Sequence, residues 1–493
     1  MQPISRRGAL LLGGAGAAAA VAGGAGLWWS LVSTPQPPGA AGGPEGSGLR
    51  SPPELRSSGG KLQLTLEAAR GELELGGRPA TALCYNGTSP GPTLRLRPGD
   101  ELGIRLVNNL DEPTNLHVHG LHVSPQANGD NVFVIVRPGE SFDYSHRLPP
   151  DHPPGVYWYH PHHHGMVAGQ IFAGLFGAII VEDPEAIPVS ADRVLLVSDT
   201  TLDRAGAVAA VTPMERMAGR EGELLLLNGQ PGPVLTARPG ERERWRIINA
   251  CTARFLRLRL DGQALALMGM DSGRSPSPAA VDEILMAPGN RADLLVTAAA
   301  GDSVLLASPQ DRGTMPGMTG RRPSTGAGPV ALATLRVSGE AAAAPDAFPA
   351  RPAAEDLRTA TVAARRQLVL AMRAGSGGMS GGMGGMMQFS INGRVYSDGR
   401  TDTIVAAGSV EEWTLVNDSP MDHPFHLHVW PMQLIEDYGQ PVDSVVMRDV
   451  VMVRANSRAT VRVAFRDFTG RSVYHCHILD HEDLGMMGVI EVR

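Results

Sequence analysis

The chain has 493 residues, which is too long for one hydrophobic core, and a typical domain size of ~150 residues predicts about three domains. Its formal net charge is -7 and its acidic and basic residues are interspersed, so the sequence offers no basic face for a nucleic-acid backbone. The 60 glycines and 39 prolines indicate many turns and short strands. We therefore expect a mostly β protein.

The N-terminus resembles a twin-arginine export signal. Arg6 and Arg7 precede an apolar run that ends near Val32, and a Pro/Gly-rich stretch follows to about Pro53. We expect residues 1–54 to be a signal and linker, and the protein to be periplasmic, extracellular or attached to the cell surface. The apolar run is also long enough to remain as a membrane anchor, and no clear cleavage site follows it.

A similar phrase occurs three times along the chain. Each copy has an Asn-Gly turn followed by a segment in which apolar residues alternate with polar ones. The three turns are Asn86-Gly87, Asn228-Gly229 and Asn392-Gly393. Each copy predicts the opening of one antiparallel β-sandwich, so we place three domains at residues 55–185, 190–340 and 362–493.

Histidine is concentrated in four His-x-His pairs, two in the first predicted domain and two in the third. The pairs are His117 and His119, His160 and His162, His426 and His428, and His475 and His477. On a strand, residues i and i+2 point to one face, so each pair presents two imidazoles to the same side. We expect all these rings to converge on one metal cluster between the first and third domains. The middle domain has no histidine and is expected to be a spacer or a wall.

The segment HCHILDH places a cysteine between the last two paired histidines. On a strand, Cys476 would face away from its neighbours, so the backbone would connect two metal sites. A thiolate, two imidazoles and a weak axial thioether form the trigonal ligand set of a blue-copper site. We expect this set to come from Cys476, His423, His481 and Met486.

These motifs resemble those of the multicopper oxidase family over almost the whole mature length of the chain. The matching phrases are HVHG at 117–120, YWYHPHHHG at 157–165, HPFHLHVW at 423–430 and HCHILDHEDLGMM at 475–487. The resemblance implies three consecutive cupredoxin-like Greek-key domains and four copper ions. The implied type 1 ligands are His423, Cys476, His481 and Met486, and the implied type 2 ligands are His117 and His426. The implied ligands of the type 3 pair are His119, His160, His162, His428, His475 and His477.

Two positions within these motifs have an alternative. His162 and His164 also form a His-x-His pair, although the preceding Trp158-Tyr159 favours His160 and His162. Met487 could replace Met486 as axial ligand, although the family spacing from the cysteine favours Met486.

The resemblance also points to two proton donors. Family members use an acid directly after the last histidine ligand, which is Glu482 here, and the alternative is a solvated surface carboxylate. Near the type 2 copper, some relatives have an acid where this chain has Asn128. We expect Asp130, two positions later, to replace it.

Methionines in Gly-rich segments point to an electron donor. One group is Met379, Met383, Met386 and Met387, and a smaller one is Met315 and Met318. Thioethers prefer Cu(I), so these groups favour cuprous ion as substrate, and the alternative is a flexible linker. Met421 lies where cuprous oxidases resembling this chain place a substrate-copper methionine. Ser419 stands where they have an acid, so Asp418 or Asp422 would have to substitute.

The expected reaction couples one-electron oxidation at a type 1 copper to four-electron reduction of dioxygen to water at a three-copper cluster. We expect a cuprous oxidase that acts in copper tolerance and also oxidises phenols. The alternatives are a general laccase for phenols, aromatic amines or low-valent metals, and a non-enzymatic copper-binding cupredoxin scaffold. Cys84 and Cys251 are expected to be buried thiols, with a disulfide between domains as the alternative.

Overall fold

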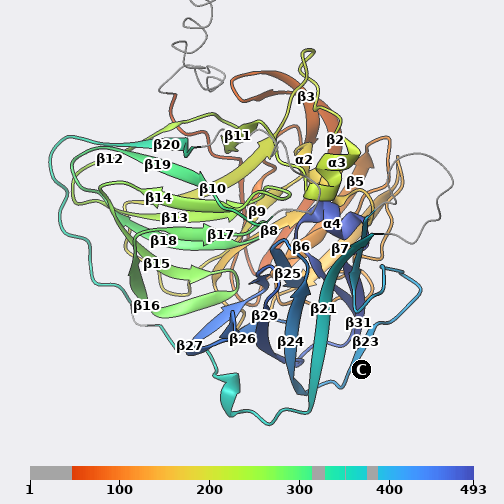
Figure 1. Ribbon diagram of the computed structural model, residues 1–493. Coiled ribbons are helices and arrows are strands. Elements are labelled where there is room, and N and C mark those ends of the chain that lie inside the picture. Colours follow the sequence, from red (N-terminus) through yellow and green to blue (C-terminus); the bar gives the residue numbers. More distant parts are fainter. Residues whose placement is uncertain (1–46, 314–327, 350, 375–386) are drawn as a thin grey trace, which may run out of the picture. The chain divides into compact units, whose positions relative to one another are not determined.

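The computed structural model describes residues 47–313, 328–349, 351–374 and 387–493 (Figure 1). Outside these ranges lie residues 1–46 of the expected signal and linker, and Met315, Met318, Met379, Met383 and Met386. Most regular structure in the described ranges is strand, so the all-β prediction is confirmed. The helices there are α2 (Val167–Phe172), α3 (Pro213–Ala218), α4 (Leu479–Asp483) and the 3-10 turn η1 (Leu357–Thr359). None of them is long and apolar enough to cross a membrane.

The first two sheets come from residues 54–181. Their strand orders are β1-β4-β9-β8-β6 and β3-β2-β5-β7. The strands are β1 (Glu54–Arg56), β2 (Lys61–Leu75), β3 (Arg78–Tyr85), β4 (Thr93–Leu96), β5 (Glu101–Asn109), β6 (His117–His119), β7 (Ser141–Arg147), β8 (Gly155–His160) and β9 (Gly177–Val181). Leu66, Leu106 and Tyr159 are fully buried and belong to one apolar core that both sheets share.

The next two sheets come from residues 191–337 and have the orders β11-β10-β13-β18-β15-β16 and β12-β20-β19-β14-β17. The strands are β10 (Ala191–Thr200), β11 (Leu224–Leu227), β12 (Val234–Ala237), β13 (Arg242–Asn249), β14 (Leu256–Leu260), β15 (Ala264–Met270), β16 (Gly273–Val281), β17 (Ile284–Met286), β18 (Arg291–Thr297), β19 (Gly301–Pro309) and β20 (Val330–Val337). Trp245 and Leu256 lie in the core between them.

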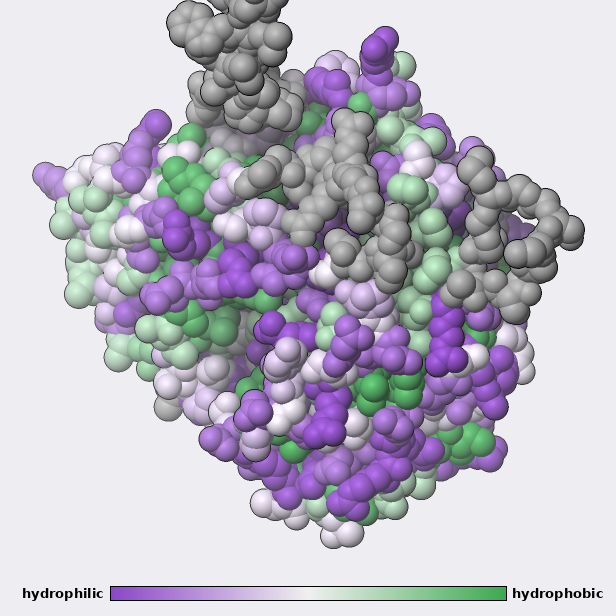
Figure 2. Space-filling view, viewed as in Figure 1, coloured by the Kyte–Doolittle hydropathy of each residue, from purple (hydrophilic) through white to green (hydrophobic). Residues whose placement is uncertain are grey.

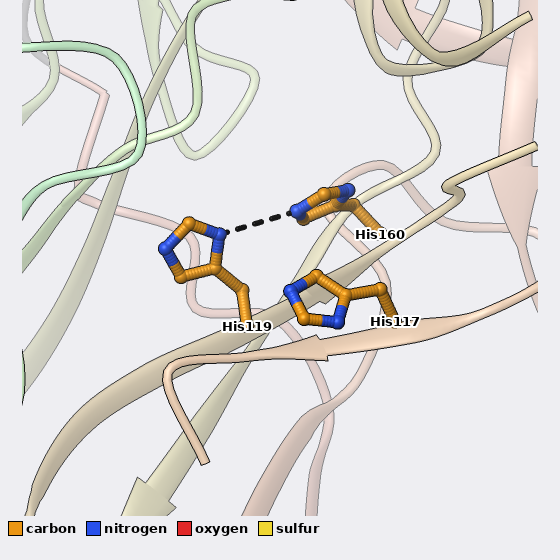
Figure 3. A group of neighbouring side chains, drawn as sticks. All are labelled: His117, His119 and His160. Atoms are coloured by element: carbon orange, nitrogen blue, oxygen red, sulfur yellow. Dashed lines mark hydrogen bonds between the residues drawn. The ribbon is translucent and has the colours of Figure 1, made fainter. Parts of the chain in front are cut away.

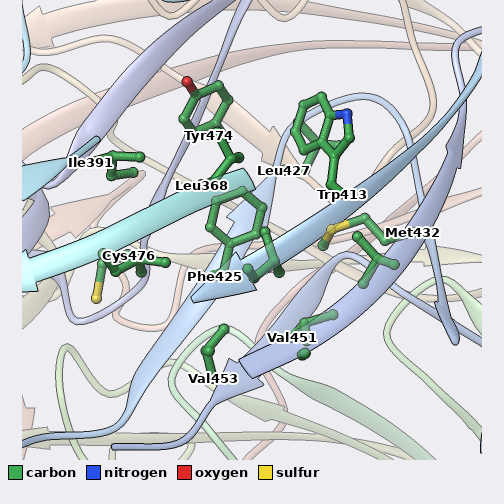
Figure 4. Packing of buried hydrophobic residues seen from close by; sticks show 14 of the residues in the cluster. Leu368, Ile391, Trp413, Phe425, Leu427, Met432, Val451, Val453, Tyr474 and Cys476 are labelled. Atoms are coloured by element: carbon green, nitrogen blue, oxygen red, sulfur yellow. The ribbon is translucent and has the colours of Figure 1, made fainter. Parts of the chain in front are cut away.

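The last two sheets have the orders β22-β21-β24-β29-β26-β27 and β23-β31-β30-β25-β28. The strands are β21 (Ala364–Ala374), β22 (Met387–Ile391), β23 (Thr403–Val405), β24 (Val410–Asp418), β25 (His423–Leu427), β26 (Met432–Asp437), β27 (Gln440–Arg448), β28 (Val450–Val453), β29 (Arg458–Ala464), β30 (Gly470–Cys476) and β31 (Met487–Val492). In β24, Trp413 and Leu415 alternate with less buried residues, as expected for a strand with one face on the core. Figure 4 shows Trp413 in this core with Phe425, Tyr474 and Cys476.

The three predicted Asn-Gly turns have the same conformation. Asn86, Asn228 and Asn392 all adopt left-handed backbone angles, with φ of 51°, 51° and 53°. In each turn the Asn side-chain oxygen accepts a hydrogen bond from a backbone N–H of the adjacent strand, at 2.7 to 2.8 Å. The repeated phrase therefore encodes one turn geometry three times.

Parallel strand pairs are a difference from the expected antiparallel pairing. β5 runs parallel to β2, β13 to β10 and β24 to β21. In each case two strands intervene in the chain, and the second of them lies in the opposite sheet. Because the chain crosses to the opposite sheet before it returns, the later strand can run in the same direction as the earlier one. Greek-key connections between two sheets allow this arrangement.

Hydrophilic and hydrophobic residues are mixed over the surface in Figure 2. The exposed large hydrophobic residues in the described ranges are Ile135, Met214, Val330, Ile404 and Tyr438. They come from separate parts of the fold and are scattered singly, as is normal for a protein surface.

Candidate metal centres

The expected mononuclear site is assembled by two neighbouring strands and a short helix. Cys476 ends β30, His423 begins β25, and Phe425 of β25 pairs with Cys476 in the sheet. His481 follows in α4. The Cys476 Sγ lies 3.4 Å from Nδ1 of His423 and 3.9 Å from Nδ1 of His481, and these two nitrogens are 3.4 Å apart. Three donor atoms of the expected types therefore face one point, and all three side chains are fully buried.

The two candidate axial methionines lie in different surroundings. Met486 is fully buried in the same apolar core as Cys476. Met487 begins β31 and packs with Val132 and Val473 in another cluster. Since consecutive residues at the start of a strand face opposite sides, this placement favours Met486 as the ligand on the Cys476 side.

Hydrogen bonds orient the two imidazoles of the mononuclear site. The Ser419 Oγ lies 2.8 Å from Nε2 of His423, and the Met217 carbonyl lies 3.1 Å from Nε2 of His481. Each contact engages the ring nitrogen remote from the sulfur, which leaves Nδ1 to bind a metal. Burial lowers the pKa of His423 to about 3, and burial raises the pKa of the Cys476 thiol. A bound cation would reverse the second effect, because a coordinated thiol is deprotonated.

The acids considered beside Met421 are engaged elsewhere. Asp418 forms an exposed ion pair with Arg373 at 3.6 Å, and Asp422 accepts a hydrogen bond from the Ala455 N–H at 2.8 Å. Met421 itself is buried in the core of the last two sheets.

The eight paired histidines converge on a second site, called here the histidine cluster. Its members are His117, His119, His160, His162, His426, His428, His475 and His477, and all are buried. β6 and β8 pair so that His117 lies opposite His160, while β25 and β30 pair so that His426 lies opposite His475. The sheets thus bring the histidines of residues 117–162 and 426–477 face to face, as the sequence predicts.

Ring nitrogens in the cluster gather in groups suited to separate ions. His119 Nδ1 lies 3.4 Å from His160 Nε2 and 3.3 Å from His477 Nε2. Figure 3 draws the contact between His119 and His160. A second group has His475 Nε2 at 3.1 Å from Nε2 of both His162 and His428. The Nε2 atoms of His117 and His426 have no hydrogen-bond partner within the described ranges. These groups follow the ligand division that the family resemblance implies, and the ligand atoms of His117 also lie within 4.8 Å of those of His119 and His160.

The donor set fits copper ions. Buried polar nitrogens without partners are costly unless something binds them, and neutral imidazole is a good copper ligand. Burial first, and then the neighbouring histidines, lower the pKa of His117, His162 and His428. These rings are therefore held in the uncharged form that a metal requires.

The alternative histidine register places His164 outside the cluster. Its ring packs against Tyr396, with centroids 4.5 Å apart, whereas His162 contacts His475. His122 and His152 contact each other instead: the His122 N–H donates to His152 Nε2 at 3.0 Å.

Both expected proton donors are buried beside cluster histidines. The carboxyl oxygens of Glu482 lie 3.6 Å from Nδ1 of His162 and 3.3 Å from Nδ1 of His475. Burial, with the nearby Asp483 carboxyl, raises the pKa of Glu482 well above its usual value. Asp130 lies 2.8 Å from Nδ1 of His117, and burial raises the pKa of Asp130 to about 7. Both groups are thus placed to hold a proton next to the cluster.

The sequence did not predict a role for three charged residues near the cluster, Asp449, Arg291 and Asp483. Asp449 contacts Nε2 of His119 at 3.1 Å and forms a buried ion pair with Arg291. Asp483 accepts hydrogen bonds from backbone N–H groups at the start of α2, including that of Ala168 at 2.9 Å. Each is a single charged residue without periodicity or a ligand-like spacing, so the sequence carries no local signal for its role.

The remaining cysteines, Cys84 and Cys251, are buried free thiols, as expected.

Comparison with known proteins agrees with this geometry. Sequence models described as multicopper oxidase match residues 67–186, 191–340 and 366–493. A multicopper oxidase of Campylobacter jejuni, titled a metallo-oxidase, is 31% identical, with a TM-score of 0.80 over 91% of this chain and 96% of that chain. The multicopper oxidase mco of Staphylococcus haemolyticus is 28% identical over 89% of this chain and 90% of its own length. Cell division protein FtsP of Yersinia pestis is 30% identical over 77% of each chain. The chain belongs to the multicopper oxidase family.

Proposed function

We propose that the protein withdraws electrons from a donor one at a time and reduces dioxygen to water. When bound, copper would supply one-electron exchange at the mononuclear site and dioxygen reduction at the histidine cluster, with one ion at the former and three at the latter. The main support for this proposal is that the segment from His475 to His477 contributes ligands to both metal centres. Its central sulfur faces His423, while its two flanking rings face cluster histidines.

The ligand assignment follows the nitrogen groups. His423, Cys476, His481 and Met486 would hold the single ion. The cluster ions would be held by His117 with His426, by His119 with His160 and His477, and by His162 with His428 and His475. The backbone around Cys476 then joins donor and acceptor sites through a few covalent bonds.

Glu482 and Asp130 would hold and deliver protons. Reduction of dioxygen to two waters consumes four protons, and general acids must stand near the cluster to supply them. The Glu482 oxygens have no hydrogen-bond partner in the described part of the chain, so nothing there competes for the proton.

The Met-rich segments support cuprous ion as the donor. Gly313, directly before residues 314–327, bridges to Met421, which is two residues from His423. Ala374 ends β21 and Met387 begins β22, and these two residues, which flank residues 375–386, pair in the sheet. Phe389, two residues after Met387, stacks on the His481 ring. Both Met-rich segments are therefore joined to parts of the chain that lie next to a ligand of the mononuclear site.

The groups that pack over the His481 ring also favour a small donor. Phe389 of β22 stacks on this ring with centroids 4.4 Å apart, and the Met217 carbonyl of α3 accepts its Nε2 proton. The ring is fully buried, so a bulky phenol has no open edge to contact. The Campylobacter jejuni relative, titled a metallo-oxidase, agrees with a metal-ion donor. Phenol oxidation would then be a slower side activity, and a general laccase is the alternative.

The test is steady-state oxygen consumption by the copper-loaded protein with Cu(I) and then with a phenol. The variant replaces Met379, Met383 and Met386 by Leu, which conserves side-chain volume but removes the thioethers. Met387 is kept, because it is a partly buried strand residue that packs on the core. Selective loss of Cu(I) oxidation would support the cuprous oxidase, whereas equal survival of both activities would favour the general laccase. The matched control is Met214→Leu, an exposed methionine on α3.

A copper-binding scaffold without turnover is the second candidate, since the FtsP relative matches most of the chain. The buried carboxyl groups of Glu482 and Asp130 beside the cluster argue against it, because a site that only binds copper needs no proton donors. Copper binding without oxygen consumption from any donor would favour the scaffold.

We further propose that the twin-arginine-like segment exports the folded protein, where it would act in copper tolerance. Replacing Arg6 and Arg7 by Lys should leave the protein in the cytoplasm. Unchanged export of this variant would refute that role.

A further inference from the structure

We propose that Arg291 is a positioning residue for the histidine cluster, acting through Asp449 on His119. Arg291 begins β18 in the middle sheets, far in sequence from every expected ligand, and its side chain is fully buried. Its two terminal nitrogens donate to the two Asp449 carboxylate oxygens at 2.5 and 2.6 Å. Asp449 Oδ1 in turn lies 3.1 Å from Nε2 of His119.

The carboxylate decides which His119 nitrogen can bind a metal. The Nδ1 atom of His119 faces His160 and His477, so this nitrogen must carry the lone pair. The ring proton then resides on Nε2, where Asp449 accepts it. A carboxylate that holds a ligand histidine in this way fixes both its tautomer and its ring orientation.

Asp449 orients a second ligand with its backbone. Its carbonyl oxygen accepts from Nδ1 of His426 at 2.8 Å, which leaves Nε2 of His426 to face the cluster. Asp449, directly before β28, thus sets the donor atoms of two histidines from different sheets, His119 and His426.

Arg291 is itself fixed by several parts of the fold. Its Nε donates to the Val156 carbonyl at 3.0 Å, and its backbone N–H donates to Asp271 at 3.0 Å. Nη1 also donates to the Gly289 carbonyl at 3.2 Å. A guanidinium has five N–H donors, enough for the Val156 and Gly289 carbonyls and both Asp449 oxygens. A lysine ammonium has three donors and cannot satisfy all four acceptors.

Two glycines make room for this arrangement. Gly120 of the HVHG phrase has φ +85°, and a Cβ there would clash with Arg291 Nη2 and lie 2.9 Å from Asp449 Oδ2. Gly289, also at φ +85°, would place a Cβ 2.8 Å from Nε2 of His477. The middle region, expected to be a spacer or a wall, therefore reaches the cluster with a charged side chain and a close backbone turn.

The test separates positioning from general stability. The double variant Arg291→Met with Asp449→Leu removes both charges of the pair, and the buried Asp271, which also contacts Arg291, keeps Asn290 at 2.9 Å and Arg448 at 3.8 Å as partners. The matched control is Arg244→Met with Asp293→Leu, which removes a buried bidentate pair from the same middle sheet. Thermal unfolding, copper bound per chain after reloading, blue absorbance and the paramagnetic resonance of the cluster copper are measured for each.

We expect the Arg291/Asp449 variant to keep the blue absorbance of the mononuclear site but to bind cluster copper roughly 10- to 100-fold more weakly. The control variant should load fully even if its unfolding temperature falls as far. Arg291→Lys should give intermediate loading, since it keeps the charge and loses the two-pronged contact.

The inference rests on the proposed copper loading, and its failure can be told apart from failure of that proposal. A natural chain that binds no copper would refute the loading itself. A natural chain and an Arg291/Asp449 variant that load the cluster with equal affinity would show that the ion pair has a structural role alone.

Discussion

The two metal centres are built on opposite plans. The mononuclear site takes its donor atoms from one pair of adjoining strands and a helix within about 65 residues of chain, from His423 to Met486. The histidine cluster draws its rings from residues 117–162 and 426–477, and its supporting ion pair joins Arg291 of the middle sheets to Asp449, which directly precedes β28. The ligands of the mononuclear site thus belong to one part of the chain, with one hydrogen bond to the Met217 carbonyl of α3. The histidine cluster forms only when three pairs of sheets dock correctly. We therefore expect that a substitution which removes the copper of one centre can leave the copper of the other centre bound.

The largest expected effect comes from Cys476→Ser. We expect complete loss of blue colour and of oxidase turnover, because the hydroxyl is a poor ligand for the soft metal that the thiolate binds. The cluster should keep its copper, since its rings are oriented by hydrogen bonds that do not involve the sulfur. Copper analysis and absorbance of the soluble variant test this. A variant that stays blue and active would refute the assignment of the mononuclear site.

Removal of copper should make the fold sensitive to acid, and the cluster should account for most of the change. Burial lowers the pKa of its histidines below the usual 6.5, to about 4 for His475 and about 3 for His160. Below pH 6.5 the unfolded chain therefore binds more protons, so the free energy of unfolding falls as the pH drops. Each histidine kept neutral removes about 1.4 kcal/mol per pH unit in that window.

Chemical unfolding of the copper-free and copper-loaded protein at pH 7.5 and 5.5 measures this effect. Loaded protein should lose less stability, because bound metal occupies the nitrogens that protons would take. Equal acid sensitivity of the two forms would contradict the prediction.

Glu482→Gln tests proton supply at the cluster without disturbing the mononuclear site. We expect kcat to fall about 100-fold or more, which is the contribution of a placed general acid, with blue absorbance unchanged. The control is Asp483→Asn at the next position, where the carboxylate caps α2. It should lower stability by about 1 kcal/mol and change turnover only through its smaller contribution to the pKa of Glu482. Equal losses of turnover in both variants would point to a shared structural cause.

Sequence patterns predicted the mononuclear site and the cluster histidines because i, i+2 spacing and sulfur chemistry depend on local chain geometry. Cys476, His475 and His477 show this directly, since strand alternation alone separates the sulfur from the two rings. The Arg291–Asp449 pair could not be predicted in this way, because the two residues are 158 positions apart in the sequence and their contact depends on how the sheets dock. The cover of His481 by the Met217 carbonyl was missed for the same reason, since a backbone oxygen leaves no trace in residue type.

The smallest expected effect concerns access to the cluster. A cavity of about 430 Å³ is lined by His162, Tyr396, Ser397 and Met487, so it reaches a cluster ring from the surface. We expect Ser397→Trp to narrow this route and to raise KM for dioxygen several-fold, while KM for the donor stays unchanged because the donor acts at the other site. The matched control is Ser457→Trp. Ser457 is a half-buried serine in a cavity of about 660 Å³, and the lining of this cavity contains no ligand of either metal centre. Steady-state kinetics at varied oxygen and donor concentrations test this prediction. A change in KM for the donor alone would show that dioxygen and the donor do not reach the two centres by separate routes. The proposed difference between the centres would then be wrong.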